Sequence, residues 1–327
     1  MTWLVTGGAG YIGSHVVRAF LDADIEVVVL DSLETGFREF VPGDVPFVEA
    51  NVTDTDTVRT TLRGHAVRGV VHVAGYKYAG VSVHRPLHTY EQNVTGTVHL
   101  LEAMAEEGVE SIVFSSSAAV YGTPDTEIVT ETTPTSPESP YGESKLVDEW
   151  VLRAQAVATG LRQTSLRYFN VVGSGYEDLY DASPHNLFPK VFKTLTDGGV
   201  PMINGDDYAT PDGTCVRDYV SVTDLAHSHV VAARALANEA ALEPVYNLGS
   251  GEGVSVRQIM DTIASVTGID FVPTIGPRRP GDPARIVASG ELAARDLEWA
   301  MRHDLTDMVR SAWGAWMHVV GRSSLPE

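Results

Sequence analysis

The chain opens on the segment Thr2-Trp-Leu-Val-Thr-Gly-Gly-Ala-Gly-Tyr-Ile-Gly13, from which its architecture can be predicted. The first residues are apolar or β-branched and predict a buried strand, and residues 12–21 have the apolar spacing of a helix. Between them lie glycines at the spacing Gly7-x-x-Gly10-x-x-Gly13. Glycines permit a tight turn and let the backbone approach a pyrophosphate at a helix N-terminus. The segment therefore predicts a strand, a turn and a helix that together bind a dinucleotide.

A carboxylate in the next strand indicates which dinucleotide. The apolar run at residues 27–30 ends at Asp31, and Ser32 and Leu33 follow without a neighbouring Arg. A carboxylate at this place accepts hydrogen bonds from a ribose 2′-hydroxyl and repels a 2′-phosphate, which favours NAD over NADP. A phosphate-binding loop of the Walker type is excluded, because no Gly-Lys-Ser/Thr follows the glycines.

The first half of the chain alternates short apolar runs with helical patterns. Such runs are typical of the buried strands of a parallel sheet whose two faces are covered by helices. We therefore predict the α/β class with a Rossmann-type doubly wound parallel sheet. The expected strands are residues 27–31, 70–74, 112–115 and 161–167, and the expected helices are residues 54–62, 86–106 and 141–159.

The pattern changes after Phe169, where Gly and Pro clusters become frequent and short helical patterns lie at residues 256–266 and 305–319. This composition is typical of a smaller, loop-rich lobe that closes over a substrate. We predict an NAD-binding Rossmann domain at residues 1–168 and a smaller C-terminal α/β substrate lobe at residues 169–327. Part of the second segment is expected to cross back to the first domain.

Composition narrows the class of protein. The 327 residues carry a formal net charge of −20, which argues against binding a nucleic-acid backbone. No run of about 18 apolar residues is present, so we expect no membrane span. The chain has a single cysteine, Cys215, and no basic leader before its first strand. Both features lead us to expect a cytoplasmic protein without a disulfide.

An acid/base set lies in the segment Tyr141-Gly-Glu-Ser-Lys145, with Ser117 upstream. Residues four apart on a helix share one face, about 6 Å from each other. A Lys ammonium in that position favours the tyrosinate form of a tyrosine, which otherwise titrates near pH ~10. A tyrosinate can take a proton from a sugar hydroxyl while the cofactor takes the hydride. The alternative is a solvated helix face, and the register with the other motifs favours the catalytic interpretation.

These motifs together resemble the extended short-chain dehydrogenase/reductases, and most closely the UDP-glucose 4-epimerase group of the NAD-dependent epimerase/dehydratase family. The resemblance is colinear and covers nearly the whole chain. It implies a cytoplasmic homodimer that catalyses the reversible 4-epimerisation of a UDP-hexose, UDP-glucose or UDP-galactose, through a transient 4-keto sugar with tightly bound NAD. The segments that carry the resemblance are residues 71–77, 93–97, 114–122, 139–145, 167–170, 213–219, 246–249 and 278–282.

The resemblance implies cofactor contacts for individual residues. Lys77 would contact the phosphates or ribose on the nicotinamide side, Lys145 would hold the nicotinamide ribose and lower the pKa of Tyr141, and Phe169 would abut the nicotinamide. The full cofactor-binding set is Gly7, Gly10, Tyr11, Ile12, Gly13, Asp31, Asn51, Val52, Val73, Ala74, Gly75, Lys77, Asn93, Ser115, Tyr141, Lys145 and Phe169.

It also implies a substrate site. Ser117 would hydrogen-bond the sugar O4 and Tyr141, and Tyr141 would be the acid/base. Two guanidinium groups would bind the diphosphate bidentately, although an Arg is more often part of a surface ion pair. Asp282 would bind the uridine ribose. The implied catalytic residues are Ser117, Tyr141 and Lys145, and the substrate-binding residues are Lys77, Ser117, Tyr141, Asn170, Asn186, Leu187, Asn204, Arg217, Arg279 and Asp282.

Four positions depart from the family pattern. Asn51 stands where the family commonly has Asp near the adenine, and its amide oxygen is expected to accept from the adenine amine. Gln92 stands where an Asn often precedes Asn93. Cys215 replaces a small residue and is expected to be a buried filler. Ile286 falls where the family tunes sugar size, and its bulk is expected to exclude N-acetyl sugars.

Competing functions differ in how well the sequence excludes them. A nucleotide-sugar 4,6-dehydratase needs an extra acid and base after Ser117, where Ala118 and Ala119 cannot exchange a proton. A 4-epimerase of UDP-glucuronate or UDP-N-acetylglucosamine would use the same Ser, Tyr and Lys, and stays open. A non-catalytic NAD-sensing regulator also stays open, although such proteins typically lose the Tyr or the Lys. A hydrolase is not expected, because no Gly-x-Ser-x-Gly elbow is present.

We expect no metal site. His84 and His88 are four apart but Pro86 breaks the helical face between them, and the remaining His residues lack the spacing of zinc ligands. For the homodimer, the resemblance implies an intermolecular bundle of the helices at residues 86–106 and 141–159. Its apolar contacts would come from Val98, Leu101, Val147 and Val151.

Overall fold

The computed structural model describes residues 1–279 and 282–323. Its centre is a seven-stranded sheet in the order β11-β6-β5-β4-β1-β2-β3, and every pair of neighbours is parallel. The α/β class and the Rossmann-type parallel sheet are thereby confirmed. The strands are β1 (Thr2–Thr6), β2 (Glu26–Asp31), β3 (Phe47–Glu49), β4 (Val67–His72), β5 (Ser111–Ser117), β6 (Arg162–Tyr168) and β11 (Val245–Leu248).

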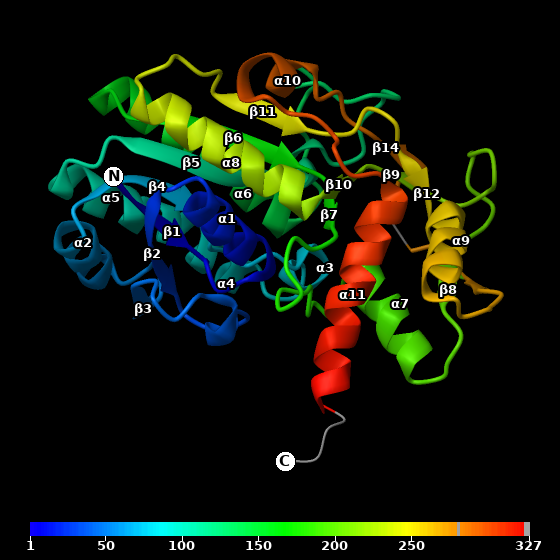
Figure 1. Cartoon of the computed structure of the whole chain (residues 1–327). Coiled ribbons are helices and arrows are strands. Elements are labelled where there is room, and N and C mark those ends of the chain that lie inside the picture. Colours follow the sequence, from blue (N-terminus) through cyan, green and yellow to red (C-terminus); the bar gives the residue numbers. More distant parts are fainter. Residues whose placement is uncertain (280–281, 324–327) are drawn as a thin grey trace.

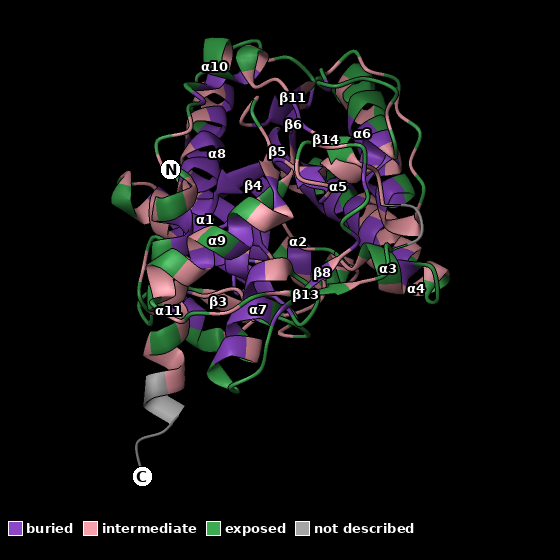
Figure 2. Cartoon of the chain, turned by 90° about the vertical axis from the view of Figure 1, so that its right-hand side faces the viewer, coloured by how far each residue is buried: buried purple, intermediate pink, exposed green. Residues whose placement is uncertain are grey.

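Successive side chains of a strand point to opposite faces, and both faces of this sheet are covered. In β1, Trp3 and Val5 belong to an apolar cluster shared with α1 (Tyr11–Asp22) and α8 (Val222–Ala237). Leu4, between them, belongs to a second cluster shared with α2 (Thr55–Gly64), α5 (Gly96–Glu107) and α6 (Pro140–Thr159). Figure 2 shows the buried residues along the strands and on the inner faces of these helices. A fully buried aliphatic side chain stabilises the fold by about 1.5–3 kcal/mol, so the continuous apolar runs specify a sheet covered on both faces.

The helix expected at residues 86–106 is wrong in one respect, because it has three parts. It begins as α4 (Pro86–Tyr90), widens into a π-helix at Glu91–Thr95 and continues as α5. A π-turn adds one residue to a helical turn and is often found at functional sites. Here it contains Asn93, whose buried side chain holds a loop of the site described below.

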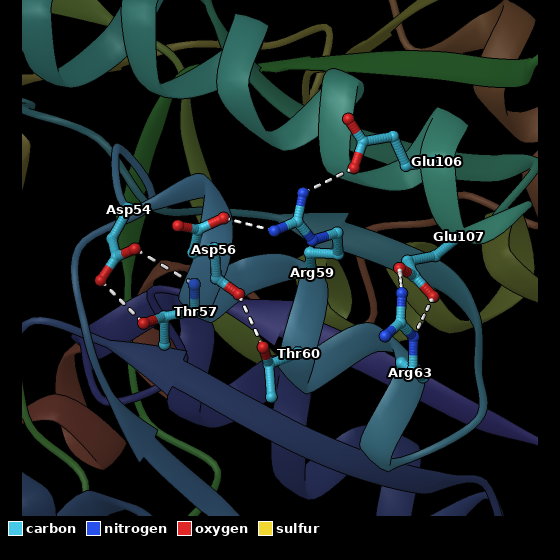
Figure 3. A network of polar contacts seen from close by, with 8 residues as sticks. All are labelled: Asp54, Asp56, Thr57, Arg59, Thr60, Arg63, Glu106 and Glu107. Carbon is cyan, nitrogen blue, oxygen red and sulfur yellow. Dashed lines mark hydrogen bonds and ion pairs between the residues drawn. The ribbon is translucent and has the colours of Figure 1, made fainter.

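Helix α2 is capped at its start and tied to α5 by ion pairs at the surface (Figure 3). The side chain of Asp54 accepts a hydrogen bond from the backbone N–H of Thr57, as in a typical N-cap. Arg59 Nη1 lies 2.8 Å from Glu106 Oε2, and Arg63 Nη2 lies 2.6 Å from Glu107 Oε1. Exposed pairs of this kind contribute little to stability, so they fix the relative orientation of the two helices more than they hold the fold.

The second half of the chain builds a smaller body beside the sheet, seen on the right of Figure 1. Its apolar cluster is made by α7 (Leu187–Thr196), α9 (Val256–Thr267) and α11 (Leu305–Ser323). Two short elements cover other parts of the molecule, namely α3 (Ala79–Ser82) and α10 (Glu291–Leu297). The short strands are β7 (Asn170–Val172) with β10 (Tyr219–Ser221), β8 (Met202–Asn204) with β13 (Thr274–Gly276), and β9 (Val216–Arg217) between β12 (Val254–Ser255) and β14 (Arg285–Ile286).

The chain after residue 169 does not stay in this smaller body. Strand β11 pairs with β6 in the large sheet, and α8 covers one face of that sheet. The division into residues 1–168 and 169–327 therefore stays a prediction about function, since the second segment contributes elements to both bodies.

One ion pair lies inside the large body. Arg167 on β6 donates from Nε to Glu149 Oε1 at 2.8 Å and from Nη2 to Glu149 Oε2 at 2.5 Å. The two side chains are 5% and 1% exposed. Ser116 Oγ donates to the same carboxylate at 2.6 Å, and Arg167 Nη1 donates to Tyr121 Oη at 2.8 Å. The pair thus ties α6 to β5 and β6.

Replacing one partner of this pair leaves a buried charge without compensation. We expect Glu149→Ala to reduce the free energy of unfolding by about 3–5 kcal/mol. Lys193→Ala, which removes an ion pair with Asp197 whose two side chains are both exposed, is the matched control and is expected to leave stability unchanged within error. Urea unfolding followed by circular dichroism measures both, and equal losses in the two variants would contradict the role given to Arg167 and Glu149.

Candidate functional site

A cavity of about 470 Å³ runs along the carboxyl ends of the central strands and into the smaller body. It lies where the strand order reverses, because β1 leads outward to β2 and β3 while β4, its other neighbour, leads to β5 and β6. Ligands of open α/β sheets bind at such a reversal. The cavity is lined by the predicted residues Gly7, Gly10, Tyr11, Ile12, Gly13, Asp31, Asn51, Val52, Val73, Ala74, Gly75, Lys77, Ser117, Tyr141, Lys145, Phe169, Asn170, Asn186, Leu187, Asn204, Arg217, Arg279 and Asp282.

The glycine turn between β1 and α1 has no room for side chains. Gly7 has a φ of +71°, and a Cβ on it would lie 2.6 Å from the backbone nitrogen of Ala74, at the end of β4. A Cβ on Gly13 would lie 2.0 Å from the Gly7 carbonyl oxygen. The first turn of α1 carries no acidic residue, and its N-cap, Gly10, makes no side-chain cap. The helix N-terminus is therefore free to bind an anion such as a pyrophosphate.

Asp31 organises the loops on both sides of this turn. Its Oδ2 accepts a hydrogen bond from the backbone N–H of Ala9 at 2.9 Å, and its Oδ1 accepts one from Leu33 at 2.9 Å. Burial raises the pKa of the carboxyl, and the two backbone hydrogen bonds lower it. Each oxygen keeps a further lone pair, so the carboxylate can still accept from a ribose hydroxyl.

Asn51 lines the cavity, but its amide oxygen is already engaged. It accepts hydrogen bonds from the backbone N–H and from the hydroxyl of Thr53, each at 3.0 Å. Its amide nitrogen donates to Gln92 Oε1 at 2.7 Å. A carbonyl oxygen has two lone pairs, so the expectation that this oxygen accepts from an adenine amine does not fit the observed arrangement. The departures at positions 51 and 92 instead compensate each other through a direct hydrogen bond.

The acid/base residues come from two adjacent elements. Ser117 ends β5, and Tyr141 lies in the first turn of α6, which begins with Pro140 and is capped by Ser139. The Ser117 and Tyr141 side chains are hydrogen-bonded to each other. Lys145, one turn further along α6, donates to the Ser115 carbonyl at 2.9 Å. Strand end and helix start therefore bring the three predicted catalytic residues to one wall of the cavity.

The pKa of Tyr141 differs from the expectation. Burial raises this pKa above its ordinary value, and the hydrogen bond with Ser117 lowers it only in part. The buried phenol loses water, which disfavours its charged form, and the Lys145 ammonium is directed at a backbone carbonyl. Burial also lowers the pKa of Lys145. The protein alone therefore favours the neutral phenol.

Two predicted residues, Asn93 and Ser115, do not line the cavity but support residues that do. Asn93 Oδ1 accepts from the backbone N–H of Tyr76 at 2.6 Å, and its Nδ2 donates to Ser144 Oγ at 2.8 Å. The expectation that Asn93 lines the groove is therefore wrong, because its side chain clamps the loop after β4 onto α6. Ser115 supplies the carbonyl that holds Lys145.

At the far end of the cavity the predicted nucleotide-binding side chains are already paired. Arg217 Nη2 lies 2.7 Å from Asp282 Oδ1. Asn204, with its amide turned to satisfy both atoms, accepts from Arg279 Nη2 at 3.0 Å. Asn186 Nδ2 donates to Asp181 Oδ2 at 2.7 Å. The contacts of Asp282 and Asn204 hold the two guanidinium groups in place at the wall of the cavity.

Several residues of the cavity wall were not predicted from the sequence. Tyr78 and His185 both line the cavity, and their ring centroids lie 4.7 Å apart. No motif links two residues so far apart in the chain, and the aromatic composition does not predict which rings will be in contact. Other unpredicted residues of the wall are Leu30, Ser32, Glu34, Thr35, Gly36, Ala50, Tyr76, Gln92, Tyr168, Val171, Asp181, Phe188, Met202, Cys215, Tyr219 and Val256.

Ile286 is not part of the cavity wall. It is half-buried and packs on the cluster that contains Val120, Tyr121 and Leu146, on which Phe169 also packs. Phe169 lines the cavity and Ile286 does not. Cys215 is buried, as expected of a filler, and burial raises the pKa of its thiol.

In residues 1–279 and 282–323, no three His, Cys, Asp or Glu side chains gather as metal ligands would. Over the same residues, no helix combines the length and the apolar character that a membrane span requires.

Comparison with known proteins agrees with this site. The chain is 42% identical over 317 residues to a UDP-glucose 4-epimerase of Corynebacterium glutamicum, and the match covers 96% of this chain and 95% of that protein. Among solved structures, the UDP-glucose 4-epimerase of Stenotrophomonas maltophila, with bound NAD and formylated UDP-arabinopyranose, superimposes with a TM-score of 0.93. It is 38% identical, and the match covers 99% of this chain and 100% of that one.

The UDP-glucose 4-epimerase of Bifidobacterium longum, in complex with NAD⁺ and UDP, superimposes with a TM-score of 0.87 at 35% identity. The match covers 97% of this chain and 98% of that one. The sequence profile of a single family matches residues 3–249, and it begins at β1 and ends just after β11. On this similarity and on the arrangement of its cavity, the chain belongs to the NAD-dependent epimerase/dehydratase family.

Proposed function

We propose that this protein is an NAD-dependent 4-epimerase that interconverts UDP-glucose and UDP-galactose. The observation that carries the proposal is the content of one cavity. The glycine turn and Asp31 line its part beside the large sheet, Arg217 and Arg279 line its part in the smaller body, and Tyr141 lines the same cavity. A dinucleotide and a nucleotide-sugar bound in these two parts would meet at the phenol.

The dinucleotide half fits NAD in its shape and in its charge. The close approaches at Gly7 and Gly13 leave backbone where side chains would block a pyrophosphate, and the N-terminus of α1 points its free N–H groups there. Asp31 presents a carboxylate, which favours a free 2′-hydroxyl over a 2′-phosphate. When bound, NAD supplies the acceptor and donor of hydride at the sugar C4.

The residues of the chain supply the proton chemistry. Tyr141 accepts the proton of the sugar O4 when C4 is oxidised, and returns it after the 4-keto sugar has presented its other face. Ser117, hydrogen-bonded to Tyr141, orients the phenol toward that oxygen. Lys145 contributes a positive charge one helical turn away, and it opposes the effect of burial on the phenol. The two arginines at the far end would hold the diphosphate during the rotation of the sugar.

The same geometry disfavours the neighbouring reactions. A 4,6-dehydratase needs a second acid and base, and the two residues that follow Ser117 are Ala118 and Ala119, which start a 3₁₀ turn. Because Ile286 does not line the cavity, its bulk carries no argument against N-acetyl sugars. An assay with several UDP-sugars therefore tests whether UDP-N-acetylglucosamine or UDP-glucuronate is also epimerised. The same assay distinguishes an enzyme from a non-catalytic NAD-sensing regulator.

Replacement of the phenol tests the assignment of the base. Tyr141→Phe keeps the ring but removes the group that takes the O4 proton, so kcat is expected to fall by about 10²–10⁴-fold while the affinity for UDP-sugar changes little. The measurement is chromatography of UDP-galactose, UDP-N-acetylglucosamine and UDP-glucuronate after incubation with the purified holoenzyme, together with calorimetric binding. Turnover of the variant near that of the wild type would refute the role of Tyr141, and no conversion of any of the sugars by the wild type would favour the regulator.

The glycine turn gives a test of the cofactor site. Gly13→Ala places a Cβ against the Gly7 carbonyl, so the turn has to shift and purified protein is expected to lose most of its NAD. Gly64→Ala is the matched control, because a Cβ there meets no atom within 4 Å. The NAD content is measured by absorbance and chromatography after denaturation. Full NAD in Gly13→Ala, or equal loss in both variants, would contradict the assignment.

We also propose that the protein is a cytoplasmic homodimer that pairs through α6. The side chains of Trp150 and Val157 on this helix are 52% and 91% exposed. Of the four apolar contacts expected, Leu101 is buried and Val151 packs against the same internal cluster, so those two belong to the core. The exposed side chains at positions 150 and 157 are the better candidates for the interface.

A charge on this face is expected to separate the two copies. Trp150→Glu places a carboxylate where the apolar contact is proposed, which makes association unfavourable. Light scattering should give twice the chain mass of 35.2 kDa for the wild type and the single mass for the variant. Val200→Glu alters an apolar residue that is also 52% exposed, far along the chain, and serves as control. A wild-type monomer, or a variant that stays dimeric, would contradict the proposal.

A further inference from the structure

Asp148 lies on α6, three residues after Lys145, and is 1% exposed. Neither of its carboxyl oxygens makes a hydrogen bond of normal length and angle with the residues that the structure describes, although the neutral Thr97 hydroxyl lies near enough to lower its pKa. Buried polar atoms are nearly always paired, so an unpaired buried carboxyl requires an explanation. An ionised carboxyl is stable in such a place only beside a positive charge.

The buried cations near this carboxyl differ in whether their charge is already matched. Arg167 makes two hydrogen bonds to Glu149, so its positive charge is matched by that carboxylate. Lys145 is 5% exposed, and its ammonium donates to the neutral Ser115 carbonyl. Residues three apart on a helix share a face, about 5–6 Å between Cβ atoms. Lys145 therefore donates to a neutral carbonyl and lies one turn from a carboxyl that makes no hydrogen bond of normal geometry with the described residues.

We propose that Asp148 is the counter-ion of Lys145 and acts as a positioning residue, whose negative charge sets the pH range in which Tyr141 and Lys145 hold their working protonation states. The effect on turnover rests on the proposed function, because 4-epimerisation requires Tyr141 to take a proton and Lys145 to be charged.

The electrostatic surroundings agree with this geometry. The pKa of Asp148 is raised to about 7, because burial outweighs the lowering by the Lys145 charge and by the Thr97 hydroxyl. Burial lowers the pKa of Lys145, and the Asp148 charge is the first influence that raises it. For Tyr141, the Asp148 charge adds to the increase in pKa that burial causes. One carboxyl thus acts on both catalytic groups.

The other titratable or charged groups around Asp148 do not change charge near neutrality. On β4, burial lowers the pKa of His72 to about 3, and the ring is hydrogen-bonded to Thr97 Oγ1 at 3.2 Å and to Thr6 Oγ1 at 2.7 Å. On α6 and β6, Glu149 and Arg167 neutralise each other. Burial raises the pKa of Tyr168, also on β6, above its ordinary value, so this phenol stays neutral.

The sign of the effect follows from the charge. Removal of a negative charge destabilises a nearby ammonium and stabilises a nearby phenolate, so the pKa of Lys145 and the pKa of Tyr141 both fall. Activity rises with pH as Tyr141 loses its proton and declines as Lys145 loses its own. Both limbs of the profile should therefore move to lower pH when Asp148 is neutralised.

The experiment compares NAD-loaded wild type with Asp148→Asn, a near-isosteric neutral variant. The kcat for UDP-galactose is measured from about pH 6 to about pH 10, the range in which perturbed Tyr and Lys groups titrate. Both limbs are expected to shift down by about one pH unit. Glu143→Gln is the matched control, because it removes an equal charge from an exposed position on the same helix and should leave both limbs in place. Asp148→Val, which also removes the charge, should shift them as Asp148→Asn does.

The proposal would be overturned if the pH profiles of Asp148→Asn and Asp148→Val had their limbs at the same pH as the wild type. A lower kcat at every pH, without movement of the limbs, would also overturn it. A second readout needs no substrate. The near-ultraviolet absorbance of tyrosinate is titrated in the NAD-loaded protein, with and without Tyr141→Phe, and the difference gives the pKa of Tyr141. That pKa should fall in Asp148→Asn. This arm remains valid if the wild type converts no UDP-hexose, so failure of the proposed function and failure of this inference are distinguishable.

Discussion

The position of the acid/base residues depends on one buried ion pair, between Arg167 of β6 and Glu149 of α6. Tyr141 and Lys145 lie two turns and one turn before Glu149 on the same helix, so the pair fixes their depth beside β5. A buried ion pair adds little net stability, because the cost of removing two charges from water offsets much of the attraction. What the pair supplies here is position. The Ser116 hydroxyl donates to the Glu149 carboxylate, and the Tyr121 phenol accepts from Arg167. Ser116 directly precedes Ser117 in β5, and Tyr121 lies in the turn that follows it.

The same burial opposes the chemistry that the helix positions. It raises the pKa of Tyr141 and lowers the pKa of Lys145, so both groups are driven toward their neutral forms. A negative charge at Asp148 acts on the two in opposite senses, since it favours the lysine ammonium and disfavours the phenolate. The site therefore works between two limits. Too little negative charge would discharge the lysine, and too much would keep the proton on the phenol.

The sequence predicts the parts of this structure that depend on local pattern. Periodicity alone places β1, β2 and α1 within a few residues, and the glycine spacing predicts a turn whose crowding at Gly13 is then observed. It cannot reveal the π-turn around Asn93, because one extra residue in a helix leaves the apolar pattern nearly unchanged. The pattern also cannot show that the Asn51 amide oxygen accepts a hydrogen bond from Thr53, or that the rings of Tyr78 and His185 are in contact. Those contacts depend on how the segments pack together.

The part of the cavity in the smaller body carries positive charge in a strongly acidic protein. Against a net charge of −20, Arg217 and Arg279 line one wall, and Lys190 on α7 lies near enough for the Arg279 charge to add to the fall in pKa that burial causes. Asp282 and Asn204 hold the two guanidinium groups. A diphosphate that binds there meets side chains whose conformational freedom is already lost, which lowers the entropic cost of binding. Arg217, Arg279 and Lys190 would repel one another if all three charges were unpaired. The Asp282 carboxylate pairs with Arg217 and reduces this repulsion, so the folded protein tolerates a cluster of positive charge that can attract an anion.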